Sequence, residues 1–290
     1  MAGQSPDSPA ARVDANVASS PYAGVGSVTI GGSTYSGVLI APGYVLTAAH
    51  VANGVSASQI TFNLNASGSM SQSIGASAVF INPKYTGPNS SGSPADADLA
   101  IIKLSQDAAP SVPYYSLYTA DVALGTTFTL VGYGDSGNGN TGAITVAASP
   151  SVKRVGQNNA DMIGASQDGM IAKALYYFDF DGPTAGSNIM GGRTLGNGIE
   201  TSVATGDSGS PAFVVDSAGH LLLAGINTFR FGTALTFGNG GGGQLIAPYA
   251  DWIATTIQPV PEPSSAQLML PALGIVGWVA MRRRKTLGEK

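Results

Sequence analysis

With 290 residues, the chain is long enough for one all-β domain of about 240 residues plus extensions. Its 40 glycines, 17 prolines and 10% charged residues favour short strands joined by tight turns over a helical protein, and with no cysteine it has no disulfide framework. The formal net charge is −4, but residues 282–290 carry +4 and leave −8 on residues 1–281, an acidic body that argues against a nucleic-acid partner.

The first 20 residues are small and polar, rich in Ala, Ser, Pro and Asp. Because such a segment buries too little apolar surface to fold, we predict a flexible leader over residues 1–20. It lacks the apolar core of a secretory signal, so we expect the signal for export to lie outside this sequence.

Short apolar runs with strand spacing fill residues 22–104. We predict strands within residues 25–30, 35–40, 44–46, 60–64, 78–82 and 99–104. The run 85–95, rich in Gly, Pro, Asn and Ser, is typical of a surface loop. His50 follows the third strand in the segment 46–50 (LTAAH), and it is one of only two histidines in the chain.

The stretch 106–124 has no clear period and fits a linker to a second group of strands. We predict these strands within residues 126–134, 144–148, 175–180, 212–215 and 221–224. Residues 135–141 carry too few carboxylates for a calcium loop and are interpreted as a plain turn. The glycine-rich residues 238–243 are interpreted as a flexible loop. Apolar side chains on one face of residues 249–257 predict a short helix.

The segment 206–211 (GDSGSP) carries the candidate nucleophile, Ser208. A serine hydroxyl needs a neighbouring base, and the oxyanion that forms on attack needs N–H groups aimed at it. Gly206 can adopt conformations closed to other residues, so its N–H and that of Ser208 can converge as an oxyanion hole. A plain loop of small residues is the alternative for this segment. His50 is the candidate base, because His220 lies on a hairpin turn close behind Ser208.

Four motifs follow one another along the chain, at residues 46–50 (LTAAH), 98–104 (DLAIIKL), 131–134 (VGYG) and 206–211 (GDSGSP). In these motifs and their order, the sequence resembles the chymotrypsin-like (trypsin-fold) serine endopeptidases over residues 21–258. The resemblance implies an all-β fold of two six-stranded antiparallel β-barrels, about residues 21–110 and 125–248, with a short C-terminal helix. It also implies a Ser-His-Asp mechanism through an acyl-enzyme, without cofactor or metal.

The α/β-hydrolases are a rival enzyme class that fits poorly. Their Gly-x-Ser-x-Gly elbow would end at Ser210, which is not glycine, and His220 is too close to Ser208 in the chain.

Two aspartates compete for the role of orienting His50. The orienting carboxylate must be buried and must accept the Nδ1–H of the imidazole. Asp98 opens an apolar strand, whereas Asp96 sits on the loop side. We therefore assign Asp98 and interpret Asp96 as a solvated loop charge.

The resemblance also suggests where the substrate binds. In that family, the residue six positions before the nucleophile lies at the base of the side-chain pocket, and here it is Ser202. Because serine has no charge to attract Lys or Arg, we predict that cleavage after basic residues is not the main activity. The family's substrate-pairing strand corresponds to a segment with Thr228, Phe229 and Arg230. A cation in place of the usual glycine would narrow the pocket or favour an acidic side chain.

Activation by proteolysis is a further expectation that the resemblance raises. In such family members a freed N-terminus pairs with the aspartate before the nucleophile, here Asp207. The bond between Arg12 and Val13 is a candidate cleavage point, although the usual Ile-Val-Gly-Gly start is missing.

Residues 259–290 combine a Pro-Glu-Pro sequence at 261–263, an apolar run at 266–281 and a basic cluster at 282–285. As a helix the run would be about 24 Å long, short of a usual membrane span but workable, with the cations in the cytoplasm. A buried C-terminal helix is the alternative. The three-part order resembles PEP-CTERM sorting signals of Gram-negative bacteria. This implies export, a transient transmembrane helix, and processing by an exosortase near residues 261–263.

We therefore expect an exported serine endopeptidase of the cell surface or envelope that acts on proteins or peptides. Ser208 attacks the scissile carbonyl, His50 takes and returns the proton, and Asp98 orients His50. The amides of Gly206 and Ser208 hold the oxyanion. The alternative from another class is a protease-fold protein that binds surface peptide or polymer without cutting it.

Overall fold

The computed structural model describes residues 2–3, 9–65, 70–87, 93–196, 198–232 and 235–258. The chain divides into two compact units, Met1–Thr256 and Ile257–Lys290. Residues 88–92 of the predicted loop 85–95 and the whole apolar run 266–281 lie outside the described residues.

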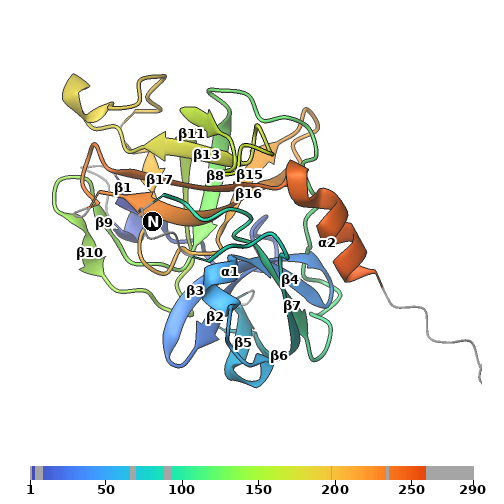
Figure 1. Ribbon diagram of the computed structural model, residues 1–290. Coiled ribbons are helices and arrows are strands. Elements are labelled where there is room, and N and C mark those ends of the chain that lie inside the picture. Colours follow the sequence, from blue (N-terminus) through green and yellow to red (C-terminus); the bar gives the residue numbers. More distant parts are fainter. Residues whose placement is uncertain are drawn as a thin grey trace, which may run out of the picture. The chain divides into compact units, whose positions relative to one another are not determined.

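Strands dominate the described part of the chain (Figure 1). They are β1 (Ala2–Gly3), β2 (Val25–Ile30), β3 (Ser33–Ala41), β4 (Tyr44–Thr47), β5 (Ile60–Leu64), β6 (Gln72–Ile81), β7 (Ala100–Leu104), β8 (Thr127–Gly132), β9 (Ser136–Asn138), β10 (Gly142–Val146), β11 (Arg154–Asn159), β12 (Met162–Gly164), β13 (Leu175–Asp179), β14 (Thr201–Ser202), β15 (Pro211–Val215), β16 (Leu221–Phe231) and β17 (Gly240–Leu245). The helices are α1 (Ala49–Ala52) and α2 (Ala250–Ile257), with 3₁₀ turns η1 (Pro9–Arg12), η2 (Ala57–Gln59), η3 (Ala185–Ser187) and η4 (Ala247–Tyr249).

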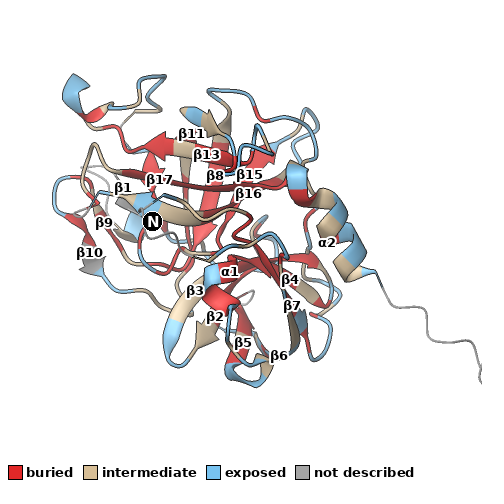
Figure 2. Cartoon of the chain, viewed as in Figure 1, coloured by how far each residue is buried: buried red, intermediate tan, exposed pale blue. Residues whose placement is uncertain are grey.

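Six strands form a closed antiparallel barrel in the order β2-β3-β4-β7-β6-β5. The barrel closes because β2 pairs with β3 on one side and with β5 on the other, so that Ser27 lies opposite both Ser36 and Asn63. Figure 2 shows the buried residues of this barrel along its strands. The fully buried apolar side chains include Val28, Leu39, Val45, Leu46, Phe62, Ile101 and Ile102. The first predicted barrel is thereby confirmed.

The second group of strands forms a seven-stranded sheet in the order β11-β8-β15-β16-β17-β13-β12. The mostly-β architecture with a short C-terminal helix is confirmed, but the second six-stranded barrel is corrected. Within the described residues the edge strands β11 and β12 do not pair, so this sheet stays open. The edge strand β12 is only three residues long and pairs with β13 alone. Strand spacing in the sequence predicts strands, but it does not reveal whether the edges meet.

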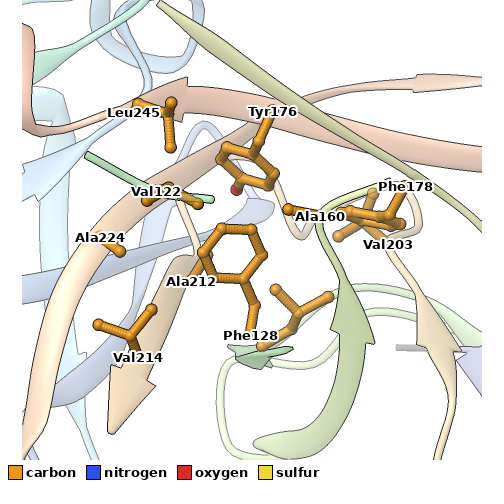
Figure 3. Close-up of a cluster of buried hydrophobic side chains, with 11 residues drawn as sticks. Val122, Phe128, Ala160, Tyr176, Phe178, Val203, Ala212, Val214, Ala224 and Leu245 are labelled. Atoms are coloured by element: carbon orange, nitrogen blue, oxygen red, sulfur yellow. The ribbon is translucent and has the colours of Figure 1, made fainter. Parts of the chain in front are cut away.

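Aromatic rings form the centre of the core on this sheet (Figure 3). Phe128 and Tyr176 are fully buried, with tilted rings whose centroids lie 4.8 Å apart. Such a pair contributes about 0.5–1.5 kcal/mol beyond its buried area. Around it pack Val122, Leu130, Ala160, Phe178, Val203, Ala212, Val214, Ala224 and Leu245. Because Val203 belongs to this cluster, the core anchors the chain just before Ser208.

The predicted flexible loop 238–243 is mostly strand, since β17 begins at Gly240. A Cβ at Gly242 would lie 2.6 Å from Phe229 Cζ, and a Cβ at Gly240 would meet the Phe231 ring. The missing side chains therefore make room for two aromatic rings of β16. We attribute the glycine run to this packing rather than to flexibility.

Residues 9–20 differ from the predicted flexible leader. Arg12 is 8% exposed and donates to Ile199 O at 2.7 Å, while Val13 bridges to Arg154. The buried Lys153 donates to Tyr22 O at 2.8 Å and lies 3.5 Å from Asp14 Oδ1. Polar side chains thus attach this segment to the second sheet. The composition of the segment alone predicts a flexible leader. The Arg12–Val13 bond therefore lies between two residues that both contact the second group of strands.

The predicted C-terminal helix is confirmed as α2, in which Ile253 is fully buried and Asp251 is exposed. In the part of the chain that the structure describes, no helix combines the length and apolar character needed to cross a membrane.

Candidate active site

Three predicted site residues lie within hydrogen-bond distance of one another. His50 Nε2 lies 2.8 Å from Ser208 Oγ, and His50 Nδ1 lies 2.7 Å from Asp98 Oδ2. The backbone N–H of His50 also donates to Asp98 Oδ1 at 2.8 Å. Asp98 is 4% exposed, whereas Ser208 is half-buried and His50 reaches the surface. The imidazole therefore connects a buried carboxylate to an accessible hydroxyl.

Strand pairing in the closed barrel positions the imidazole and the carboxylate. Thr47 at the end of β4 lies opposite Ala100 at the start of β7. His50 follows Thr47 and Asp98 precedes Ala100, so both emerge at one end of this strand pair. Ala97 adopts a left-handed φ of 50°, which turns the chain immediately before Asp98.

The loop that carries Ser208 depends on two glycines. Gly206 has a φ of 92° and Gly209 a φ of 83°, conformations that disfavour a residue with a Cβ. A Cβ at Gly209 would also overlap Thr47 Oγ1, so this loop approaches the closed barrel as closely as glycine permits. Among the described residues, the N–H groups of Gly206 and Ser208 have no acceptor, and both residues line a cavity. Two N–H donors are therefore available to a ligand.

Asp207 lies beneath this loop with its carboxylate turned inward. Its Oδ1 accepts the N–H of Gly134 and its Oδ2 accepts the N–H of Ala204, both at 2.9 Å. A Cβ on Gly132 would overlap the same carboxylate. The glycines of the segment 131–134 are therefore required by the close approach of Asp207.

Ser36 of β3 contributes to the site, although no motif marks it. Its N–H donates to Ser208 O at 3.0 Å, and its hydroxyl donates to Gly206 O at 3.1 Å. The same hydroxyl accepts the N–H of Tyr133 at 3.0 Å, and the residue is fully buried. One serine of the closed barrel thus holds two carbonyls of the loop with Ser208. In the sequence it stands beside an apolar run, which carries no signal of this role.

Two cavities adjoin these residues. The nucleophile cavity, of about 390 Å³, is lined by Ser208, Gly206, Val203 and residues 227–230, among others. The aromatic cavity, of about 560 Å³, is lined mainly by His50, Tyr85, Pro94, Tyr177, Phe229 and Phe231. Thr228, Phe229 and Arg230, the predicted substrate contacts, line both cavities.

Ser202, the predicted base of the pocket, does not line the nucleophile cavity. It is fully buried in β14, where it pairs with Ala2 of β1. Val203 lines the cavity instead, and its Cγ2 would lie 2.5 Å from a Cβ at Gly241. The prediction for Ser202 is therefore corrected. The cavity lining begins at Val203 and continues through Ser208, so Ser202 lies just outside it, within β14.

Asp96 is not the solvated loop charge that the sequence suggested. Its two carboxylate oxygens lie 2.8 and 3.0 Å from the N–H of Gln167, which donates to them. This contact ties the segment before Asp98 to a loop of the second sheet.

His220, the other histidine, lies on an exposed hairpin turn and faces its own partner. Its Nδ1 lies 3.0 Å from Asp216 Oδ2, and the residue lines neither cavity.

Four carboxylates gather beside β13, and we call them the acidic cluster: Asp161, Asp179, Asp181 and Glu200. The N–H of Asp179 donates to Asp161 at 3.2 Å, and the N–H of Asp181 donates to Glu200 at 2.6 Å. Burial raises the pKa of Glu200 to about 7, and burial with the adjacent Asp179 charge raises the pKa of Asp161. In the described ranges, no group of three or more His, Cys, Asp or Glu residues could hold a metal ion.

Comparisons with known proteins give two family matches. The family model described as trypsin matches residues 12–253, and that of the PEP-CTERM protein-sorting motif matches residues 259–285. No curated protein matches the sequence. Among solved structures, neuropsin, a serine protease expressed in the limbic system of mouse brain, is similar with a TM-score of 0.56. It is 19% identical, over 83% of this chain and 96% of that chain, which is a likeness of fold.

Proposed function

The chain belongs to the trypsin family of serine proteases, and on that premise we propose that it is an active endopeptidase that cleaves peptide bonds through Ser208, His50 and Asp98. The observation that carries this proposal is the continuous hydrogen-bonded path from Asp98 through His50 to Ser208, at 2.7 and 2.8 Å. Distances of this length permit proton transfer without rearrangement of the free site.

His50 acts as the base. With its Nδ1–H directed at Asp98, the Nε2 lone pair faces Ser208 Oγ and takes the proton as the oxygen attacks the scissile carbonyl. The imidazolium that forms is stabilised by the buried carboxylate beside it. It then returns the proton to the leaving amine, and water activated in the same way hydrolyses the acyl-enzyme.

The amides of Gly206 and Ser208 hold the oxyanion. Both N–H groups are without an acceptor among the described residues, and both residues line the nucleophile cavity. Donors already fixed in position stabilise the developing charge without reorganising during the reaction.

A peptide substrate binds along the second half of β16. β15 pairs with β16 only up to Ile226, so Phe229, Arg230 and Phe231 pair with β17 alone and leave one edge of β16 open. An extended peptide can add to such an edge through main-chain hydrogen bonds. The aromatic cavity beside His50 then receives an apolar side chain from a substrate residue at least two positions before the scissile bond.

The chain also carries a PEP-CTERM protein-sorting motif, which indicates export and association with the surface or envelope of a Gram-negative bacterium. We propose that residues 259–290 form a separate sorting segment that an exosortase recognises and processes near residues 261–263. The protease would then act on proteins or peptides outside the cytoplasm.

The proposal is tested by treating the full chain with a fluorophosphonate probe, beside a Ser208→Ala control. We expect one label per chain in the unaltered protein and none in the control, because only an activated serine reacts at this rate. If neither protein is labelled while circular dichroism shows both folded, the site is not assembled for catalysis and the proposal fails.

A further inference from the structure

We propose that Arg230 makes this protein prefer substrates with an acidic side chain, Glu or Asp, at the residue whose carbonyl Ser208 attacks. The inference rests on the proposed function and names its substrate class.

The pairing of β16 with β17 places Arg230 on the face of the nucleophile cavity. Arg230 lies opposite Gly241, and directly opposite residues of an antiparallel pair project to the same face. A Cβ on Gly241 would point at Val203, which lines that cavity. Phe229 and Phe231 alternate to the other face, opposite Gly242 and Gly240. Arg230 and Phe229 border both cavities, whereas Phe231 lines the aromatic cavity. Arg230 is thus the cation of a wall that also contains Ser208 and Gly206.

The guanidinium of Arg230 has N–H donors that can bind a substrate. Arg230 is exposed, and its Nη1 donates to Gly232 O at 3.2 Å, which uses one of its five N–H donors. Among the described residues it forms no ion pair. A carboxylate can therefore bind it in the two-point geometry that guanidinium groups favour.

The carboxylates that reach the two cavities are already bound to other groups. Asp207 accepts the N–H groups of Gly134 and Ala204, and Asp98 accepts two N–H groups of His50. A Lys or Arg side chain of a substrate would therefore be repelled by Arg230 and would find no available carboxylate to bind among the described residues that line the cavity.

The test uses the full chain and a set of peptides that differ only at the residue before the scissile bond, which is Glu, Gln or Lys. For the unaltered protein we expect kcat/KM to be about tenfold higher for Glu than for Gln, and lowest for Lys. Arg230→Gln should bring the Glu-to-Gln ratio close to one. Arg193→Gln, which removes an exposed arginine that lines neither cavity, should keep the original ratio.

The same ratio is measured without turnover, as the calorimetric affinity of the Ser208→Ala chain for the Glu and Gln peptides. A ratio near one in the unaltered protein, or a ratio unchanged in Arg230→Gln, overturns the inference. If either result is found while the unaltered protein still cleaves the Gln peptide, the proposed function stands without a preference for acidic side chains. If no peptide is cleaved and the fluorophosphonate probe does not react, both the proposed function and the inference that rests on it fail.

Discussion

Asp98 decides which nitrogen of His50 carries the proton. Its Oδ1 is occupied by the backbone N–H of His50, so only Oδ2 faces the ring, at 2.7 Å from Nδ1. A carboxylate can only accept there, which directs Nδ1–H toward Asp98 and leaves the Nε2 lone pair for Ser208. This two-point contact also fixes the orientation of the ring.

Replacing Asp98 by Asn should reverse this arrangement. In the variant the amide oxygen stays with the backbone N–H of His50, so the amide NH₂ faces Nδ1. The ring proton is then forced onto Nε2, and Nε2 can no longer accept the proton of Ser208. We expect kcat to fall by about 10⁴-fold with little change in KM. Steady-state kinetics on a peptide substrate measures this, with Asp96→Asn as the matched control that keeps activity. A variant that retains a tenth of the activity would contradict the role assigned to Asp98.

At the scale of elements, the contact between β3 and the loop that carries Ser208 joins the two groups of strands. Ser36 binds Ser208 O and Gly206 O from one position, and the N–H of Tyr133, the residue after β8, donates to the hydroxyl of the same serine. The base belongs to the closed barrel and the nucleophile to the second sheet. The Nε2–Oγ distance therefore depends on this junction.

Ser36→Ala removes the hydroxyl and leaves two buried backbone groups without their partner. We expect a loss of about 1–3 kcal/mol in the free energy of unfolding, and a fall in kcat of about tenfold as the nucleophile shifts. Ser27→Ala is the matched control, since Ser27 is also fully buried in the closed barrel and donates to Pro150 O at 2.9 Å. Urea unfolding and kinetics on both variants measure the two effects. Equal losses of activity in both would show that Ser36 acts only through stability.

For the whole molecule, the acidic cluster makes the stability of the fold depend on pH. Burial raises the pKa of Glu200 to about 7, and burial together with Asp179 raises that of Asp161. The folded state therefore holds protons that the unfolded chain releases above about pH 4. Because the folded state binds more protons in this range, its stability falls as the pH rises from 4 toward 8.

Asp161→Asn keeps the shape of the protonated side chain and removes its titration. We expect the variant to be more stable than the unaltered protein by about 2 kcal/mol at pH 8, and about equally stable at pH 5. Denaturant unfolding at the two pH values measures the difference. Asp251→Asn, which removes an exposed carboxylate on α2, should leave the pH dependence unchanged. The same gain in stability for Asp161→Asn at both pH values would contradict a titrating group.

Much of the described fold could be predicted from the sequence, because strand spacing and glycine turns are local signals. The strands of the closed barrel and the helix α2 follow from such patterns. The glycines of β17 mislead the same reasoning, because their purpose is to receive Phe229 and Phe231. The attachment of Arg12 was equally out of reach, since its partner Ile199 lies 187 residues away in the chain.

By itself the sequence determined the candidate chemistry, because Ser208, His50 and Asp98 each stand in a motif whose residue types suit one step of a reaction. The tertiary structure alone decided how these residues are supported and what faces the substrate. Ser36 bonds to Gly206 across 170 residues, and Val203 rather than Ser202 reaches the cavity. The physical reason is that hydrogen bonds and packing depend on distance in space, and the pairing of strands sets that distance, not the spacing along the chain.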